Sequence, residues 1–254
     1  MPQTLAAGHR LEYAWIEGGD PTLVFLHEGL GSIARWRDFP EQVAQATGCR
    51  VLVYDRYGYG KSDVLREPRT GVEYMHDAAL NELPDLLENL AIENPVLIGH
   101  SDGASIALIH AGTYLARGVV TLSAHVFAED IGLESIRHLK REFETGDLKD
   151  RQAKYHRDAS KTFHLWADAW LDPAFRDWNI EEYLPRIKCP LLAIQGEDDK
   201  YGTMAQLDAI GRQAGGSCEL LKLPDCGHSP HKDQPDKVLD CVSAFIKRII
   251  GTNS

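Results

Sequence analysis

Residues 95–111 read PVLIGHSDGASIALIHA, and this stretch decides the fold. Its first four residues form an apolar run typical of a buried strand, and residues 104–111 have the pattern of a helix. Between them lies the G-x-S-x-G sequence of residues 99–103. In this context the sequence predicts a strained turn that lifts the Ser101 hydroxyl above the end of the strand. Glycine at positions 99 and 103 would let the neighbouring backbone pass closely. A plain Gly/Ser loop before a helix is the simpler alternative, and residues elsewhere in the chain decide against it.

Strands alternate with helices along most of the chain. Short apolar runs predict strands at 11–16, 23–27, 50–54, 96–99, 119–123, 191–195 and 219–223. Helical patterns predict helices at 36–47, 74–90, 104–117, 204–214 and 235–250. The alternation predicts an α/β fold with a doubly wound, mostly parallel sheet, whose ligands bind at the carboxyl ends of the strands.

One long segment interrupts this alternation. Residues 131–187 contain no convincing strand, and their helical patterns are rich in aromatic residues, including Trp166 and Trp170. The segment is too long for a simple connection. We expect it to form a helical lid inserted into a core made of residues 1–130 and 188–254. The alternative is a helical layer packed beside the sheet, with its tryptophans serving only as core.

The composition argues against several classes of protein. Hydrophobic residues make up 43% and charged residues 26% of the 254 positions, as in an ordinary globular chain. The net charge of −11 argues against nucleic acid as a partner, because phosphates need a basic face. No apolar run approaches the roughly 20 residues that span a bilayer, and residues 1–11 lack a secretory signal. We therefore expect a cytoplasmic protein with no membrane partner.

Neither a cofactor nor a metal is expected. The five cysteines are scattered, odd in number and without a C-x-x-C pair, which is typical of reduced thiols. His228 and His231 form an H-x-x-H sequence, but no third ligand accompanies them. The chain has no dinucleotide or P-loop motif. The expected partner is a small-molecule substrate, and the sequence leaves the oligomeric state open.

A serine nucleophile needs a base, and the base needs a group that orients it. Candidates for both follow later strands. The strand at 191–195 is followed by Gly196-Glu197-Asp198-Asp199, and the strand at 219–223 by Pro224-Asp225-Cys226-Gly227-His228. The order serine, aspartate, histidine, each after a strand, is the order expected for a nucleophile on such a turn. This agreement is far more specific than any one motif.

On these motifs the chain resembles the α/β-hydrolase superfamily over nearly its whole length. It is most similar to capped serine hydrolases such as small-ester esterases, meta-cleavage-product hydrolases and relatives of non-haem haloperoxidases. The resemblance implies that Ser101 is the nucleophile and His228 the base. It also implies that the acid lies three residues after the glycine that ends its strand, at Asp199, with Asp198 as the alternative.

Two glycine loops extend the resemblance. Residues 27–32, HEGLGS, resemble the family's histidine-glycine oxyanion loop, although glutamate stands where glycine is usual. The resemblance implies that the backbone N–H of Gly29 binds the oxyanion, with Glu28 or Leu30 as alternatives, while His27 braces the loop. The second N–H would come from Asp102, directly after the nucleophile. Residues 54–62 resemble the family's D-x-x-G-x-G-x-S loop, where Asp55 and Arg56 would form a buried polar brace.

Two carboxylates border the expected site. Glu28 and Asp102 could attract a cationic group of a substrate, or they could cap turns and bond to backbone N–H groups. We expect Glu28, Trp166 and Trp170 to contact the substrate, and the aromatic lid indicates a hydrophobic one. The expected function is hydrolysis of a small, largely apolar carboxylic ester or related acyl bond. The alternatives are carbon–carbon bond hydrolysis of ring-cleavage products with the same three residues, and a non-catalytic ligand-binding protein.

Overall fold

The fold is built on one eight-stranded sheet, seen in a computed structural model that describes residues 1–66 and 72–251. Its strand order is β1-β2-β4-β3-β5-β6-β7-β8. The strands are β1 (Gln3–Ala6), β2 (His9–Ile16), β3 (Gly19–Leu26), β4 (Cys49–Tyr54), β5 (Val96–His100), β6 (Gly118–Leu122), β7 (Leu191–Gly196) and β8 (Cys218–Leu223). Strands β1 and β2 pair antiparallel at one edge, and β2 pairs antiparallel with β4. The other six strands, β4-β3-β5-β6-β7-β8, all run parallel. The predicted doubly wound, mostly parallel α/β sheet is confirmed.

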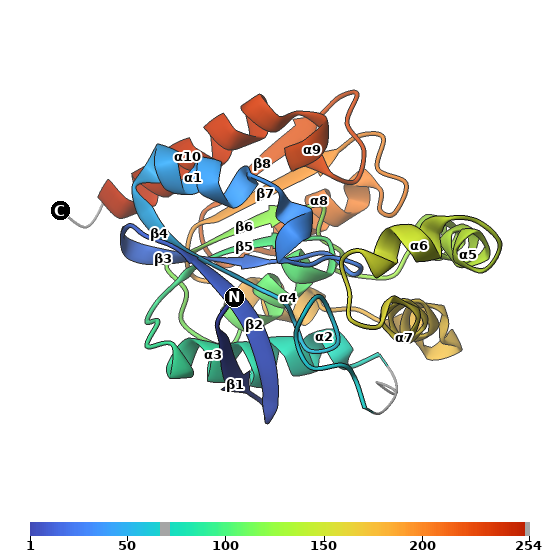
Figure 1. The fold of residues 1–254 in the computed structure, drawn as a ribbon. Coiled ribbons are helices and arrows are strands. Elements are labelled where there is room, and N and C mark those ends of the chain that lie inside the picture. Colours follow the sequence, from blue (N-terminus) through green and yellow to red (C-terminus); the bar gives the residue numbers. More distant parts are fainter. Residues whose placement is uncertain (67–71, 252–254) are drawn as a thin grey trace.

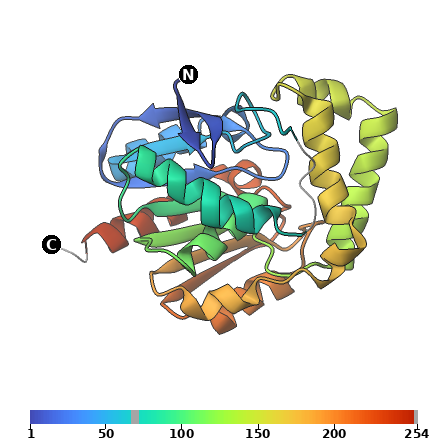
Figure 2. The ribbon, with the colours of Figure 1, turned by 90° about the horizontal axis from the view of Figure 1, so that it is seen from below.

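Helices cover both faces of the sheet (Figures 1 and 2). One layer contains α1 (Phe39–Thr47) and α10 (Pro235–Gly251), which share an apolar cluster with the sheet. The other contains α3 (Leu83–Asn89), α4 (Asp102–Ala111) and α8 (Met204–Gln213), which pack in a second cluster. Shorter segments complete the core: η1 (Ile33–Trp36), α2 (Tyr74–Asp77), η2 (Ala78–Glu82) and α9 (Pro230–Asp233).

Strand β5 lies inside the sheet, between β3 and β6, and leads directly to Ser101. Alternate side chains of a strand point to opposite faces. Accordingly, Leu97 packs in the cluster with α4, while Val96 and Ile98 pack in the cluster with α1 and α10. All three side chains are fully buried. A continuous apolar run is therefore what this position requires.

Between β6 and β7 the chain forms a separate group of helices. They are α5 (Asp130–Thr145), α6 (Leu148–Ala153), α7 (Ala159–Leu171), η3 (Pro173–Asp177) and η4 (Glu181–Arg186). Helices α5, α6 and α7 pack on one another beside the core (Figure 1), and the rings of Phe143 and Phe163 stack at a centroid distance of 3.8 Å. That residues 131–187 act as a lid remains a prediction.

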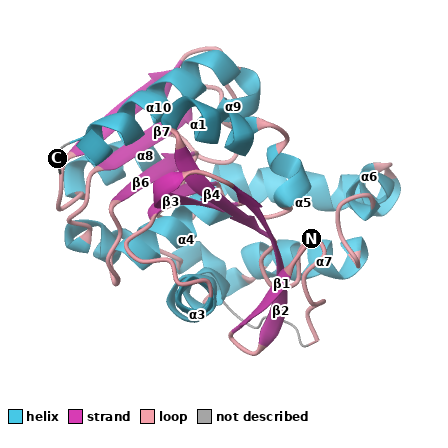
Figure 3. Cartoon of the chain, turned by 60° about the vertical axis from the view of Figure 1, so that its left-hand side comes forward, coloured by secondary structure: helices cyan, strands magenta, loops and turns pink. Residues whose placement is uncertain are grey.

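Three details of the predicted elements were wrong. Strand β1, at the sheet edge beside β2, was not predicted (Figure 3). Helix α4 ends at Ala111 rather than at 117, and at Gly112, which follows it, a Cβ atom would lie 2.8 Å from the Tyr183 carbonyl oxygen. The helix predicted at 36–47 is divided, since Arg37 has φ of 56° and α1 begins at Phe39. None of the helices in the described ranges is long and apolar enough to cross a membrane.

Candidate active site

The turn after β5 holds Ser101 in a strained conformation. Its φ of 53° and ψ of −121° lie in a backbone region that residues other than glycine rarely adopt. A Cβ atom on Gly99 would overlap the carbonyl oxygen of Gly103, and one on Gly103 would overlap the carbonyl oxygen of Leu26. Both glycines are therefore needed for the backbones to pass this closely. The Ser101 N–H donates to the Leu122 carbonyl at 2.9 Å, which ties the turn to β6.

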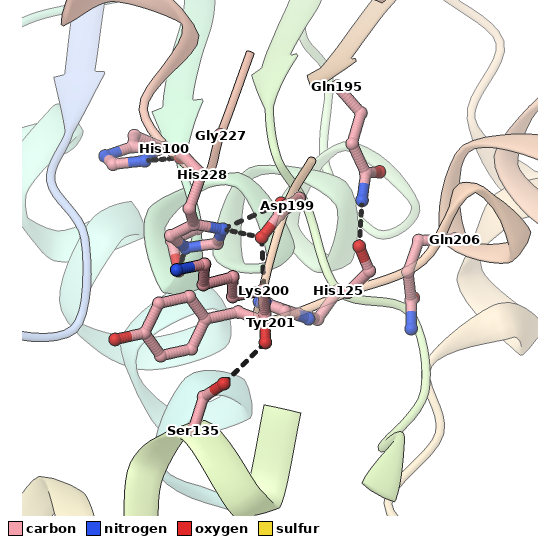
Figure 4. Close-up of polar contacts among 12 residues, drawn as sticks. His100, His125, Ser135, Gln195, Asp199, Lys200, Tyr201, Gln206, Gly227 and His228 are labelled. Atoms are coloured by element: carbon pink, nitrogen blue, oxygen red, sulfur yellow. Dashed lines mark hydrogen bonds and ion pairs between the residues drawn. The ribbon is translucent and has the colours of Figure 1, made fainter. Parts of the chain in front are cut away.

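Ser101, His228 and Asp199 form a continuous chain of hydrogen bonds. The Ser101 hydroxyl lies 2.8 Å from Nε2 of His228. Nδ1 of His228 lies 2.8 and 2.9 Å from the two Asp199 oxygens (Figure 4). With Asp199 ionised, Nδ1–H of His228 donates to the carboxylate and Nε2 accepts from the serine. The alternative acid, Asp198, is exposed and makes no side-chain contact of this kind.

The Asp199 carboxyl is held in its ionised form. Burial alone would raise its pKa, but the hydrogen bond and charge of His228 and the N–H of Tyr201 lower the pKa below its ordinary value. That N–H donates to Oδ1 at 2.8 Å. Ser135 on α5 donates to the Lys200 carbonyl at 2.6 Å, so the helical insertion is tied to the loop that carries Asp199 (Figure 4).

Two further histidines flank His228. Nε2–H of His100 donates to the His228 carbonyl at 2.7 Å and so holds the backbone of the loop that carries His228. The ring of His125 lies 5.6 Å from the His228 ring. Burial lowers the pKa of His125 to about 3, with a smaller contribution from the His228 charge. His125 is therefore neutral at physiological pH.

Hydrogen bonds of the His27 and Arg56 side chains hold the loop of residues 27–31 in place. Nε2 of His27 accepts from the Arg56 N–H at 3.1 Å, and its Nδ1–H donates to the Glu28 carbonyl at 2.7 Å. The Arg56 guanidinium donates to the same carbonyl at 3.0 Å. Asp55 accepts from the backbone N–H groups of Ile33 and Lys61, each at 2.7 Å. These contacts place His27, Asp55 and Arg56 in the bracing positions that the sequence predicts.

Gly29 lies at the cavity beside Ser101. Among the described residues, no group accepts a hydrogen bond from the N–H of Gly29 or of Asp102. The N–H groups of Glu28 and Leu30 likewise have no acceptor among the described residues. A free N–H therefore does not decide which residue of this loop is the oxyanion donor. A Cβ atom on Gly29 would overlap the indole of Trp166. Glycine is thus required here for the helical insertion to approach the loop.

The Glu28 carboxylate sits among three basic groups. It lies 3.5 Å from Nε of Arg35, 3.6 Å from Nζ of Lys232 and 3.6 Å from Nδ1 of His100. Burial would raise its pKa, but the nearby His100, Lys232 and Arg35 hold the pKa well below its usual range. The carboxylate is thus ionised and already compensated.

The Asp102 carboxylate is buried on the other side of Ser101. It accepts from the Tyr74 hydroxyl at 2.6 Å. Burial raises its pKa, and the nearby Arg56 charge and the Tyr74 hydrogen bond offset part of that effect. Asp102 therefore resembles a structural acceptor more than a free anion. This contact is a side-chain hydroxyl, so it is neither the turn cap nor the backbone N–H bond that one alternative expected, and it leaves the role of the side chain open.

A cavity of about 240 Å³ opens in front of the nucleophile. The core and the helical insertion both line it, with Glu28, Gly29, Leu30, Arg35, His100, Ser101, Tyr201, His228 and Ser229 from the core and Leu139, Leu148, Gln152 and Trp166 from the insertion. A smaller pocket beside it includes Asp102, His125, Trp166 and Trp170. Of the predicted substrate contacts, Glu28 and Trp166 thus border the main cavity and Trp170 only the smaller one.

Sequence reasoning missed several residues of this cavity. Arg35 belongs to no recognised motif, and only the fold shows that it lies at the cavity. Tyr201 lies two residues after Asp199, and that proximity was a usable signal. Leu139, Leu148 and Gln152 lie in the predicted lid, whose inward face could not be identified. Within the described residues, no group of three or more His, Cys, Asp or Glu side chains is placed to hold a metal ion.

Comparison with known proteins identifies the family. Residues 23–240 match the model of the alpha/beta hydrolase family. This chain belongs to that family. As an alpha/beta hydrolase it is an enzyme, and the strand–turn–helix at Ser101 is one of the features on which the resemblance was based.

Individual relatives vary in their named activities. The hydrolase is similar to a proline iminopeptidase of Lactobacillus helveticus, with 34% identity over 271 residues that cover 89% of this chain and 90% of the relative. It is also similar to 3-oxoadipate enol-lactonase 1 of Acinetobacter baylyi, 26% identical over 90% of each chain. The fold matches that of a meta-cleavage product hydrolase from Pseudomonas fluorescens IP01, with a TM-score of 0.77, 19% identity and 98% coverage of both chains.

Proposed function

We propose that this alpha/beta hydrolase cleaves a small carboxylic ester, or a related acyl bond such as a lactone, through an acyl-enzyme. The observation that carries the proposal is the unbroken hydrogen-bond chain from Ser101 through His228 to Asp199 at a small cavity. Such a chain activates a serine that is otherwise a weak nucleophile.

In the proposed first half-reaction, the Ser101 oxygen attacks the acyl carbon and His228 takes the hydroxyl proton on Nε2. Asp199 stabilises the resulting imidazolium through Nδ1–H. The negative charge moves to the former carbonyl oxygen, for which the N–H groups of Asp102 and Gly29 are the proposed donors. The tetrahedral intermediate then collapses, the bond to the leaving group breaks, and His228 returns the proton to that group.

In the second half-reaction, water attacks the acyl-serine. His228 takes a proton from the water, and the resulting tetrahedral intermediate releases the acid as the proton returns to the Ser101 oxygen. The helical insertion supplies Leu139, Leu148 and Trp166 to the cavity wall, so we propose that residues 131–187 form a lid that keeps bulk water from the acyl-enzyme.

The polar groups of the cavity favour an ester over the free N-terminal amine that an aminopeptidase binds. An ammonium group needs an available carboxylate. Glu28 is already paired with Lys232 and Arg35, and Asp102 accepts from Tyr74 beside the Arg56 charge. No observation singles out carbon–carbon bond hydrolysis, and the intact hydrogen-bond chain argues against a non-catalytic binding protein.

A direct screen tests this proposal. Purified protein is incubated with p-nitrophenyl acetate and butyrate, with prolyl p-nitroanilide, and with a coloured dienoate ring-cleavage product. We expect release of p-nitrophenol from the esters, at a rate that far exceeds turnover of the anilide or the dienoate. Faster cleavage of the anilide would reassign the enzyme to aminopeptidases, and faster loss of the dienoate would reassign it to carbon–carbon hydrolases.

A further inference from the structure

Arg35 presents unused hydrogen-bond donors to the cavity. Its Nε faces Glu28 at 3.5 Å, and its guanidinium lies over the Tyr155 ring, 5.2 Å from the centroid. Among the described residues, no acceptor bonds to its two terminal amino groups, and these atoms are not among the buried ones. The side chain is only 34% exposed. The Nε atom is therefore paired with Glu28, while the two terminal amino groups remain available to a ligand.

The charges around Arg35 leave a positive excess. Glu28 contributes one negative charge and lies between two cations, Arg35 and Lys232. Glu28 lines the cavity beside Arg35, but its charge is shared between these two partners. An anion bound to the terminal amino groups of Arg35 would therefore neutralise the remaining positive charge of this group of side chains.

A second cavity of about 350 Å³ adjoins the first through shared wall residues, and it is also basic. Arg35, Leu148 and Gln152 line both cavities, and the second adds Arg151 and Lys154. Arg151 is paired with Glu142 at 2.6 Å and with Asp147 at 3.4 Å, whereas Lys154 is exposed and pairs with no acidic side chain among the described residues. The whole chain carries a net charge of −11. The basic side chains near the nucleophile are therefore a local feature and do not reflect the overall charge of the protein.

We infer that Arg35 is a carboxylate-binding residue, and that the substrate of this hydrolase carries a carboxylate in addition to the acyl bond attacked by Ser101. The inference rests on the proposed function and narrows its substrate class. A planar carboxylate can accept two parallel bonds from a guanidinium, which makes it the anion that this fork fits best. The apolar wall formed by Leu30, Leu148 and Trp166 would enclose the few carbons between the two groups.

Two matched pairs of probe esters test the inference. p-Nitrophenyl hemisuccinate replaces the terminal methyl of p-nitrophenyl butyrate by a carboxylate, so this pair reports an acyl-side anion. 4-Acetoxybenzoate and 4-methylphenyl acetate report an anion in the leaving group. The measured quantity is the ratio of kcat/KM for the charged ester to that for the neutral ester, within each pair.

In wild type we expect one of the two ratios to favour the charged ester. Arg35→Gln should reduce that ratio by roughly ten- to hundredfold, chiefly through KM, as expected for loss of a charged hydrogen bond. Arg35→Lys should restore only part of it, because ammonium lacks the planar fork. Arg37→Gln, an exposed change of equal charge outside the cavity, is the control and should leave the ratio unchanged. Equal ratios in wild type and Arg35→Gln for both pairs would overturn the inference.

A binding measurement separates this inference from the proposed function. Sodium succinate should raise the Tm of wild type, and Arg35→Gln should abolish that rise while Arg37→Gln retains it. If no ester is cleaved but this pattern holds, the ester assignment fails and the carboxylate site stands. If esters are cleaved with unchanged ratios and succinate has the same effect on all three proteins, the carboxylate site fails and the ester assignment stands.

Discussion

At the scale of single residues, the site depends on which charged groups are paired. Asp199 and Asp198 are neighbours of the same chemistry, but only Asp199 contacts His228, and Asp198 is exposed. Glu28 and Asp102 flank the nucleophile, and each is compensated by partners from other loops. Position in the fold, and not residue type, therefore determines what each carboxylate can do.

The difference between the two aspartates is measurable. Asp199→Asn should lower kcat for p-nitrophenyl esters by roughly 10³–10⁴-fold, since the amide favours the wrong tautomer of His228 and cannot stabilise its cation. Asp198→Asn provides the control of equal chemistry and should remain close to wild type. Steady-state kinetics on folded variants checks both. A large loss in Asp198→Asn with little change in Asp199→Asn would contradict the assignment.

The sequence predicts the order of the site residues better than their partners. Ser101, Asp199 and His228 each follow a parallel strand, and the carboxyl ends of parallel strands meet at one edge, so their convergence is predictable. The pairing of Glu28 with Arg35 and Lys232 depends on how separate loops meet, and no local pattern encodes it. The same limit applies to Gln152 and Leu139, because helical periodicity does not say which face meets the cavity.

At the scale of elements, the turn between β5 and α4 is the most constrained part of the fold. Gly103 lies in the first turn of α4, where alanine would ordinarily be the better helix former. Here its Cβ would overlap the backbone of β3 at Leu26, which cannot move without displacing the sheet. Packing therefore overrides helix propensity at this position. The same conflict explains why G-x-S-x-G is informative only when a strand precedes it and a helix follows.

A pair of glycine substitutions tests this constraint. Gly103→Ala should lower the free energy of unfolding by at least about 2 kcal/mol, as expected for overpacking against rigid backbone. Gly251→Ala, at the end of α10, meets nothing within 4 Å and should leave stability unchanged or slightly higher. Urea unfolding measures both. Equal stability of the two variants would show that the turn tolerates a side chain.

At the scale of the whole molecule, a rigid core carries the proposed catalytic residues and a separate helical group faces them. Every residue of α4 is buried, whereas α5 buries only Gly132, Leu133, Ile136 and Phe143. Within the predicted lid at 131–187, α5, α6 and α7 thus pack chiefly on one another, whereas η4 at its end packs on α4 and α8 of the core.

This difference predicts uneven local stability. Amide hydrogens of α5 and α6 should exchange with solvent much faster than those of α4 and β5, because segments with few buried contacts open at lower free energy. Hydrogen exchange followed by mass spectrometry measures this directly. Equal protection of α5 and α4 would indicate that the insertion is part of the rigid core and would count against its role as a lid.

The central claim is that Ser101 is an activated nucleophile, and covalent labelling tests it most directly. A fluorophosphonate probe is added to wild type and to Ser101→Ala, the folding of each is checked by circular dichroism, and the modified peptide is identified by mass spectrometry. We predict that wild type forms an adduct at Ser101 and that the folded variant forms none. A folded wild-type protein that stays unlabelled, or one labelled at a different serine, would contradict the account.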